Sequence, residues 1–266
     1  MGSEPSPAPK PTRRGIYLLP NLFTTAALFA GFYAVVAAMG DRFEAAAVAV
    51  FVAMLLDGVD GRVARLTHTQ TAFGTEYDSL SDMVSFGVAP ALVAYEWSLR
   101  YMGKLGWLAA FIYTAAAALR LARFNTQVEV ADKRYFQGLP SPSAAAIVAG
   151  LVWFGTDQGL TGEGVRHVAA ALTVVAGLLM VSNLRYYSFK GLDLRDKVRF
   201  VTVLIGVLVF VLVSIQPSHV LFFLFLAYAA SGPIVTLVQR RRRRASRRGP
   251  PAAKGEGAGP GEDRGG

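Results

Sequence analysis

Long apolar runs separated by short polar segments dominate the chain from residue 17 to residue 238. A helix of about 20 apolar residues crosses the ~30 Å hydrocarbon core of a bilayer, and most of these runs approach that length. The pattern predicts eight helices, at residues 17–39, 45–66, 77–99, 105–124, 143–155, 165–181, 200–215 and 220–238. The fifth run is short for a full span, so counts of six or seven helices stay open. The expected fold class is all-α, a polytopic transmembrane helical bundle.

The two ends of the chain lack this pattern. Residues 1–14 are rich in proline and contain no apolar run, and residues 240–266 begin with an arginine run and continue with glycine, proline and alanine. Such compositions cannot bury a core. We therefore expect a disordered cytoplasmic N-terminus at 1–14, a transmembrane domain at 15–239 and a basic, disordered cytoplasmic tail at 240–266.

Charge supports a membrane setting and gives an orientation. The 266 residues are 53% hydrophobic and 17% charged, with a net charge of +9 and no cysteine, which excludes disulfides and thiolate metal sites. Lysine and arginine gather in alternate connections and at 240–244, a bias typical of the cytoplasmic side of a membrane protein. This distribution predicts an integral protein of the cytoplasmic membrane with both termini inside. It gives no support for nucleic-acid binding.

Four aspartates interrupt the second and third apolar runs: Asp57, Asp60, Asp78 and Asp82. Each charge at bilayer depth costs at least ~2.5 kcal/mol, so a cluster needs a compensating cation or a polar substrate. The spacings within the two pairs, three and four residues, put both carboxylates of a pair on one helix face. The apolar run 45–56 covers ~18 Å, which leaves Asp57 roughly 12 Å below the inner edge of the hydrocarbon core. Antiparallel neighbours would bring all four into one pocket open to the cytosol.

Carboxylate oxygens are the ligands that Mg²⁺ and Mn²⁺ prefer. Two such ions a few ångströms apart can clamp a pyrophosphate and stabilise charge on the attacking and leaving oxygens, which indicates phosphoryl transfer. Gly61, Ala64 and Gly74 stand beside the aspartates, where larger side chains would block a bulky ligand.

The stretch 57–82 resembles the signature of the CDP-alcohol phosphatidyltransferase family, D-x-x-D-G-x-x-A-R-x(8)-G-x-x-x-D-x-x-x-D, at every fixed position. The resemblance implies that Asp57, Asp60 and Asp78 bind two divalent ions, Mg²⁺ or Mn²⁺. It further implies that Asp82 is the catalytic base and a possible fourth metal ligand, and that the protein is a homodimer. The implied CDP-binding residues are Gly61, Ala64, Arg65 and Gly74, joined by Asn21 and Thr24 at the entry of the first helix.

Three further segments, 81–91, 120–125 and 138–144, resemble the branch of this family that uses serine as the acceptor. Arg120 and Arg123 lie one turn apart at the predicted cytosolic end of the fourth helix, where a guanidinium can pair with the carboxylate of serine. Positive-inside anchoring is the competing interpretation of both arginines. The expected reaction transfers the phosphatidyl group of CDP-diacylglycerol, drawn from membrane lipid, to the hydroxyl of L-serine and releases CMP.

Two alternatives stay open. The same chemistry could use another acceptor alcohol, such as glycerol 3-phosphate or inositol phosphate, since the aspartate signature does not discriminate among acceptors. A cation transporter would also place carboxylates inside helices. The second half of the chain has no second acidic cluster, and a transporter leaves the spaced Gly, Ala and Arg positions unexplained.

Overall fold

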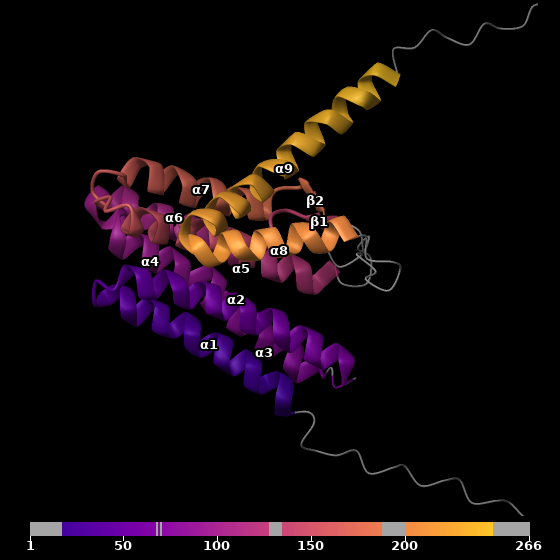
Figure 1. Ribbon diagram of the computed structural model, residues 1–266, viewed down its shortest axis with the longest axis horizontal. Coiled ribbons are helices and arrows are strands. Elements are labelled where there is room, and N and C mark those ends of the chain that lie inside the picture. The colour runs from indigo at the N-terminus through magenta and orange to yellow at the C-terminus, as the bar shows by residue number, and fades with distance from the viewer. Residues whose placement is uncertain (1–17, 68, 70, 128–134, 188–199, 247–266) are drawn as a thin grey trace, which may run out of the picture.

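The computed structural model describes residues 18–67, 69, 71–127, 135–187 and 200–246. The helices are α1 (Leu18–Met39), α2 (Phe43–Leu66), α3 (Ala72–Asp82), α4 (Ala89–Trp97), α5 (Lys104–Gln127), α6 (Ser141–Asp157), α7 (Arg166–Val181), α8 (Phe200–Ile215) and α9 (Pro217–Ser246). A π-helix, η2 (Met83–Val88), joins α3 and α4 into one continuous helical rod, and a 3₁₀ turn, η3 (Leu99–Met102), follows α4. The described residues thus form a bundle of helices (Figure 1).

Each of the eight predicted apolar segments coincides with a helix or, for 77–99, with most of the α3–η2–α4 rod. The all-α prediction is therefore confirmed, and the fifth segment, α6, is short as expected. The sequence analysis missed one small feature, the antiparallel pairing of β1 (Tyr135–Gln137) with β2 (Arg185–Tyr187). Strands of three residues are too short to display an alternating pattern.

Three helices of the described residues are long and apolar enough to cross a membrane, at Pro20–Met39, Lys104–Thr126 and Pro217–Thr236. Others are shorter or, like α2, contain several charged residues. Helix α9 continues to Ser246, beyond the predicted end of the bundle at residue 239, and arginine is among the stronger helix formers. The predicted N-terminal segment 1–14 and the tail after Ser246 lie outside the described residues.

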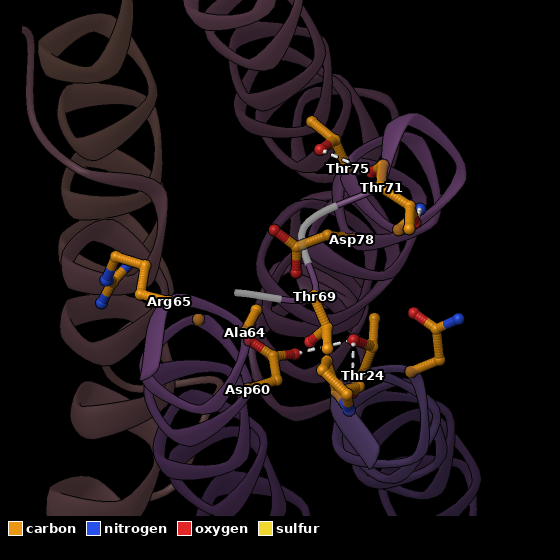
Figure 2. Close-up of a pocket in the computed structure, with 12 residues that line it drawn as sticks. Thr24, Asp60, Ala64, Arg65, Thr69, Thr71, Thr75 and Asp78 are labelled. Atoms are coloured by element: carbon orange, nitrogen blue, oxygen red, sulfur yellow. Dashed lines mark hydrogen bonds between the residues drawn. The ribbon is translucent and has the colours of Figure 1, made fainter. Parts of the chain in front are cut away.

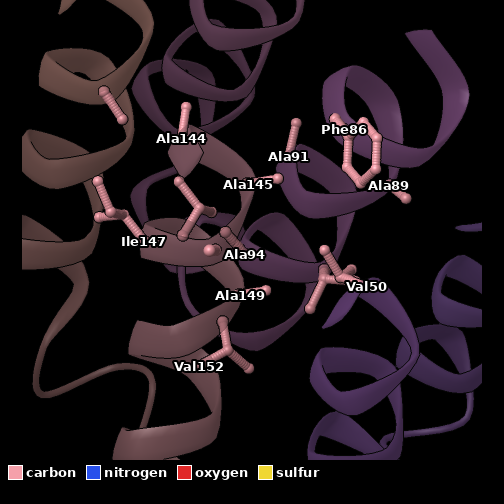
Figure 3. Packing of buried hydrophobic residues seen from close by; sticks show 14 of the residues in the cluster. Val50, Phe86, Ala89, Ala91, Ala94, Ala144, Ala145, Ile147, Ala149 and Val152 are labelled. Carbon is pink, nitrogen blue, oxygen red and sulfur yellow. The ribbon is translucent and has the colours of Figure 1, made fainter. Parts of the chain in front are cut away.

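The core consists largely of alanine and other small residues. Helix α6 is buried over most of its length and packs against α4, whose Ala91 and Ala94 are among the small residues of this core (Figure 3). Small side chains let helix backbones approach closely. Close packing matters here because, in lipid, helices associate through van der Waals contacts rather than through the hydrophobic effect. This α4–α6 layer is the support behind the helices that bear the aspartates.

Helices α1 and α2 form an antiparallel hairpin joined by a tight turn at Gly40–Arg42, and α3 packs against α1 (Figure 1). The second half of α2 and the first half of α3 therefore meet at one end of the bundle, beside the start of α1. This is the end where the sequence places its aspartates.

Candidate active site

Asp57 and Asp60 on α2 meet Asp78 on α3 in one cluster. One carboxylate oxygen from each of the three lies within 4.8 Å of the others. Asp60 is 4% exposed, and Asp57 and Asp78 are partly buried. Three negative charges this close repel one another strongly away from bulk water, so the arrangement favours a bound cation. Carboxylate oxygens suit a hard divalent ion, and the cluster can hold a metal.

Asp78 supplies a second indication of a missing positive partner. Its Oδ1 is buried and has no hydrogen-bond partner among the described residues. Buried carboxylate oxygens are normally satisfied by donors or by metal ions, so an orphaned oxygen inside an acidic cluster fits the ligand set of a cation.

Helix α1 fixes the orientation of the cluster. The hydroxyl of Thr24 donates a hydrogen bond of 2.8 Å to Asp60 Oδ2, and Ser81 Oγ on α3 donates one of 3.1 Å to the Thr24 carbonyl. Thr24 therefore binds α2 through its side chain and α3 through its backbone. When a hydroxyl donates a hydrogen bond to one oxygen of a metal-binding carboxylate, the other oxygen stays oriented toward the metal.

A pocket of about 250 Å³ opens in front of the cluster (Figure 2). Asp60 and Asp78 project into it from opposite helices. Its lining is Pro20, Asn21, Thr24, Asp60, Gly61, Ala64, Arg65, Thr69, Thr71, Gly74, Thr75 and Asp78. The predicted CDP-binding residues therefore share one cavity with two of the predicted metal ligands.

Two glycines keep this pocket open. A Cβ added at Gly74 would lie 3.1 Å from Thr71 Oγ1 and 3.4 Å from Asn21 Oδ1, so any side chain there would enter the space between α1 and α3. A Cβ at Gly61 would lie 3.4 Å from Arg65 Nη1, which shows that the Arg65 guanidinium folds across the glycine.

Three threonines of the lining, Thr69, Thr71 and Thr75, were missed by the sequence analysis. Thr71 is the N-cap of α3 and accepts a 3.0 Å hydrogen bond from the Gly74 amide. A threonine three residues before Gly74, at the start of a predicted helix, is a capping signal that could have identified it. No comparable signal marks Thr69, since its position depends on how the connection between α2 and α3 turns.

Asp82 lies one helical turn further along α3 than Asp78 and is not part of the pocket lining. Its carboxyl is within hydrogen-bonding reach of Asp57, and Arg120 on α5 interacts with it electrostatically. Asp82 thus lies near both Asp57 and the Arg120 guanidinium, outside the described pocket lining.

The two predicted acceptor-binding arginines lie in different surroundings. Arg120 donates from Nη1 to Ser141 Oγ at 2.7 Å, and its buried Nε has no partner among the described residues. Arg123 donates from Nη1 to the Val181 carbonyl at 3.2 Å and to Asn183 Oδ1 at 3.3 Å, at the end of α7. Only Arg120 is therefore brought next to the aspartates.

Comparison with known proteins gives consistent matches. The model of a family described as CDP-alcohol phosphatidyltransferase matches residues 17–188. A Helicobacter pylori protein named CDP-diacylglycerol--serine O-phosphatidyltransferase is 38% identical over 196 residues, which cover 74% of this chain and 83% of that protein. Proteins of the same name from Methanocaldococcus jannaschii and Saccharomyces cerevisiae are 35% and 37% identical, over 52% and 47% of this chain and 61% and 50% of their own lengths.

Proposed function

The chain belongs to the CDP-alcohol phosphatidyltransferase family, and from this premise we propose that it transfers the phosphatidyl group of CDP-diacylglycerol to the hydroxyl of L-serine, giving phosphatidylserine and CMP. The observation that carries the proposal is the convergence of Asp57, Asp60 and Asp78 in one cluster, two of whose members, Asp60 and Asp78, line a pocket of about 250 Å³. The names of the relatives support serine as the acceptor.

Asp57, Asp60 and Asp78 would hold two divalent ions, Mg²⁺ or Mn²⁺, with Asp82 as a possible additional ligand. When bound, such ions neutralise the pyrophosphate and stabilise charge on the leaving CMP oxygen. Thr24 keeps Asp60 directed toward the cluster through its 2.8 Å hydrogen bond.

The pocket between α1, α2 and α3 binds the CDP portion of the lipid. Asn21 offers amide groups to the nucleotide, and Arg65, an exposed guanidinium on the lining, pairs with a phosphate. Gly61, Ala64 and Gly74 have no side chain or a methyl group only, so the nucleotide can approach the helix surface closely. The acyl chains remain in the lipid beside the bundle.

Asp82 acts as the general base. It accepts the proton of the serine hydroxyl while that oxygen forms a bond to the β-phosphorus, and the bond from this phosphorus to the CMP oxygen breaks in line. Asp82 lies one turn beyond Asp78 and outside the three-aspartate cluster. This position supports separate roles, in which the three clustered aspartates serve the pyrophosphate and Asp82 serves the acceptor.

Arg120 binds the carboxylate of serine. Its Nε has a free donor in a buried position, and a guanidinium can pair with a carboxylate through two parallel hydrogen bonds. Arg123 uses its donors on α7 and Asn183, so we assign it a structural role.

The chain is an integral membrane protein. We propose that it lies in the cytoplasmic membrane with its active site facing the cytoplasm, because the lysines and arginines gather in the connections at that end. The family resemblance further supports a homodimer.

The test is metal-dependent CMP release from CDP-diacylglycerol by the purified protein, with L-serine, glycerol 3-phosphate and inositol 1-phosphate offered separately. Release that depends on serine alone supports the proposal. Release with another alcohol would retain the aspartate site and replace the acceptor. No release with any of them, together with metal flux into proteoliposomes, would favour the cation transporter.

A further inference from the structure

The rod that carries Asp78 and Asp82 changes from α-helix to π-helix directly after Asp82. Within η2 the backbone hydrogen bonds join residues five apart instead of the four of an α-helix. The Ala89 amide, for example, donates to the Val84 carbonyl. One extra residue in a turn rotates the segments before and after it by about 100° relative to an uninterrupted α-helix. The π-helix therefore sets the direction of the acidic half of the rod relative to α4, which is locked into the core.

One side of this π-helix is fixed against α1. Ser85 Oγ donates a 3.1 Å hydrogen bond to the Ala27 carbonyl, and Ser85 is fully buried. The two backbones approach closely, since a Cβ added at Gly31 would lie 2.7 Å from Ser85 Cα. Together with the Ser81 bond to Thr24, this contact prevents α3 from sliding along α1.

The other side is held by a tyrosine from α5. Tyr113 is fully buried, and its hydroxyl donates a 2.9 Å hydrogen bond to the Phe86 carbonyl in the middle of η2. The Thr114 hydroxyl lies 3.4 Å from the Gly87 carbonyl and closer, 3.0 Å, to the Ala110 carbonyl of its own helix. Pro90 has no N–H for the bond that a regular α-helix would give the Phe86 carbonyl, so a regular helix is disfavoured here. Irregular backbone at membrane depth is tolerated where side chains supply the missing partners, and Tyr113 supplies the partner of this carbonyl.

A single face of α5 follows the rod from η2 to the site. Tyr113, Ala117 and Arg120 recur at intervals of four and three residues, which is one stripe of a helix. A Cβ at Gly87 would lie 3.2 Å from Ala117 Cβ, and Arg120 interacts with Asp82. Helix α5 thus makes both contacts: Tyr113 bonds the π-helix, and Arg120 interacts with Asp82.

We propose that Tyr113 is a positioning residue for Asp82. Its hydroxyl holds the π-helical turn at Phe86, and this turn directs the Asp82 carboxylate toward Asp57 and the acceptor. Tyr113 itself is not among the residues that line the pocket. The inference rests on the proposed function only for the role of Asp82 as the base.

The kinetic test is Tyr113→Phe, which removes one hydroxyl and keeps the ring. Because misplacement of a catalytic group by about 1 Å costs up to ~100-fold, we expect kcat to fall roughly 10-fold to 100-fold. The KM for CDP-diacylglycerol and the Mn²⁺ concentration for half-maximal rate should change by less than about twofold, since Asp60 is held independently by Thr24.

Tyr186→Phe is the matched control. Tyr186 is also fully buried, and its hydroxyl donates a 3.0 Å hydrogen bond to the Ala229 carbonyl on α9, away from the pocket lining. Both variants lose one buried tyrosine-to-carbonyl bond, so they should lose similar thermal stability, whereas only Tyr113→Phe should lose kcat. An equal loss of kcat in both variants, or none in Tyr113→Phe, would overturn the proposal.

A second measurement does not depend on turnover. The chain has no cysteine, and Ser79 Oγ on α3 lies 3.1 Å from Asn125 Nδ2 on α5, so the double variant Ser79→Cys/Asn125→Cys reports how α3 faces α5. We expect its disulfide to form at least ~10-fold more slowly when Tyr113→Phe is added, because a disulfide tolerates only a narrow range of Cβ separations and a shift of α3 moves one of the two Cβ atoms. An unchanged rate would contradict the positioning role even if serine proved not to be the acceptor.

Discussion

The hydroxyl of Thr24 on α1 lies 2.8 Å from Oδ2 of Asp60 on α2 and donates a hydrogen bond to it. The carboxylate is 4% exposed, and the threonine is equally buried. This contact ties the aspartate cluster to the first helix, which contributes no carboxylate of its own to it.

Thr24→Val keeps the shape of the side chain and removes the hydroxyl. We expect the Mn²⁺ concentration for half-maximal CMP release to rise roughly 10-fold to 100-fold, the usual effect of losing a group that orients a metal ligand. A Mn²⁺ titration measures it. Thr173→Val is the control, since Thr173 is equally buried but bonds only the Ala169 carbonyl of its own helix. An unchanged titration for Thr24→Val would show that Asp60 needs no support.

Asp78→Asn removes a charge from the cluster while keeping its volume. We expect activity to be lost, and we expect the metal-free variant to melt above the metal-free parent, because three close carboxylates repel one another. Mn²⁺ should raise the melting temperature of the parent and have little effect on the variant. Thermal unfolding in detergent with and without Mn²⁺ measures both effects. A variant that melts lower and still gains stability from Mn²⁺ would argue against Asp78 as a ligand.

Asp82→Asn should separate catalysis from binding. Because Asp82 is not among the residues that line the pocket, we expect CDP-diacylglycerol still to bind. We expect kcat to fall by at least ~100-fold, the lower range for a lost general base. Binding can be followed by the stabilisation that the lipid nucleotide gives against heat. If binding is lost together with turnover, the two roles are not divided as proposed.

Arg120→Lys and Arg123→Lys should differ. A lysine at 120 keeps the charge but cannot pair bidentately, so the KM for serine should rise at least ~10-fold with little change for CDP-diacylglycerol. A lysine at 123 should lower thermal stability and leave the KM for serine unchanged, because Arg123 binds the end of α7. Initial rates measured over a range of serine concentrations give the KM of each variant. A raised KM for serine in Arg123→Lys and not in Arg120→Lys would mean that Arg123 binds serine and Arg120 is structural.

Gly74→Ala should narrow the nucleotide pocket. The new Cβ would lie 3.1 Å from Thr71 Oγ1, so we expect a several-fold higher KM for CDP-diacylglycerol despite the gain of about 1 kcal/mol in helix propensity. Gly58→Ala on α2 is the control, because nothing lies within 4 Å of a Cβ there. Equal kinetics for the two variants would place the nucleotide elsewhere.

The positions of the helices and most residues of the candidate site could be predicted from the amino-acid pattern alone. Apolar runs of bilayer length are local properties of the chain. The spacing of Asp57 and Asp60, like that of Asp78 and Asp82, puts both members of a pair on one helix face because a helix repeats every 3.6 residues. The small residues beside them followed from the same linear pattern, as did their resemblance to a known family.

The tertiary structure decided which side chains become partners across helices. Arg120 and Arg123 looked equivalent in the sequence, yet only Arg120 lies beside Asp82, since the crossing of α5 with α7 turns Arg123 away. The bond from Tyr113 to Phe86 and the π-helix that it holds were likewise not predicted. Helical periodicity gives the face on which a residue lies, but the element packed against that face depends on contacts between segments far apart in the chain.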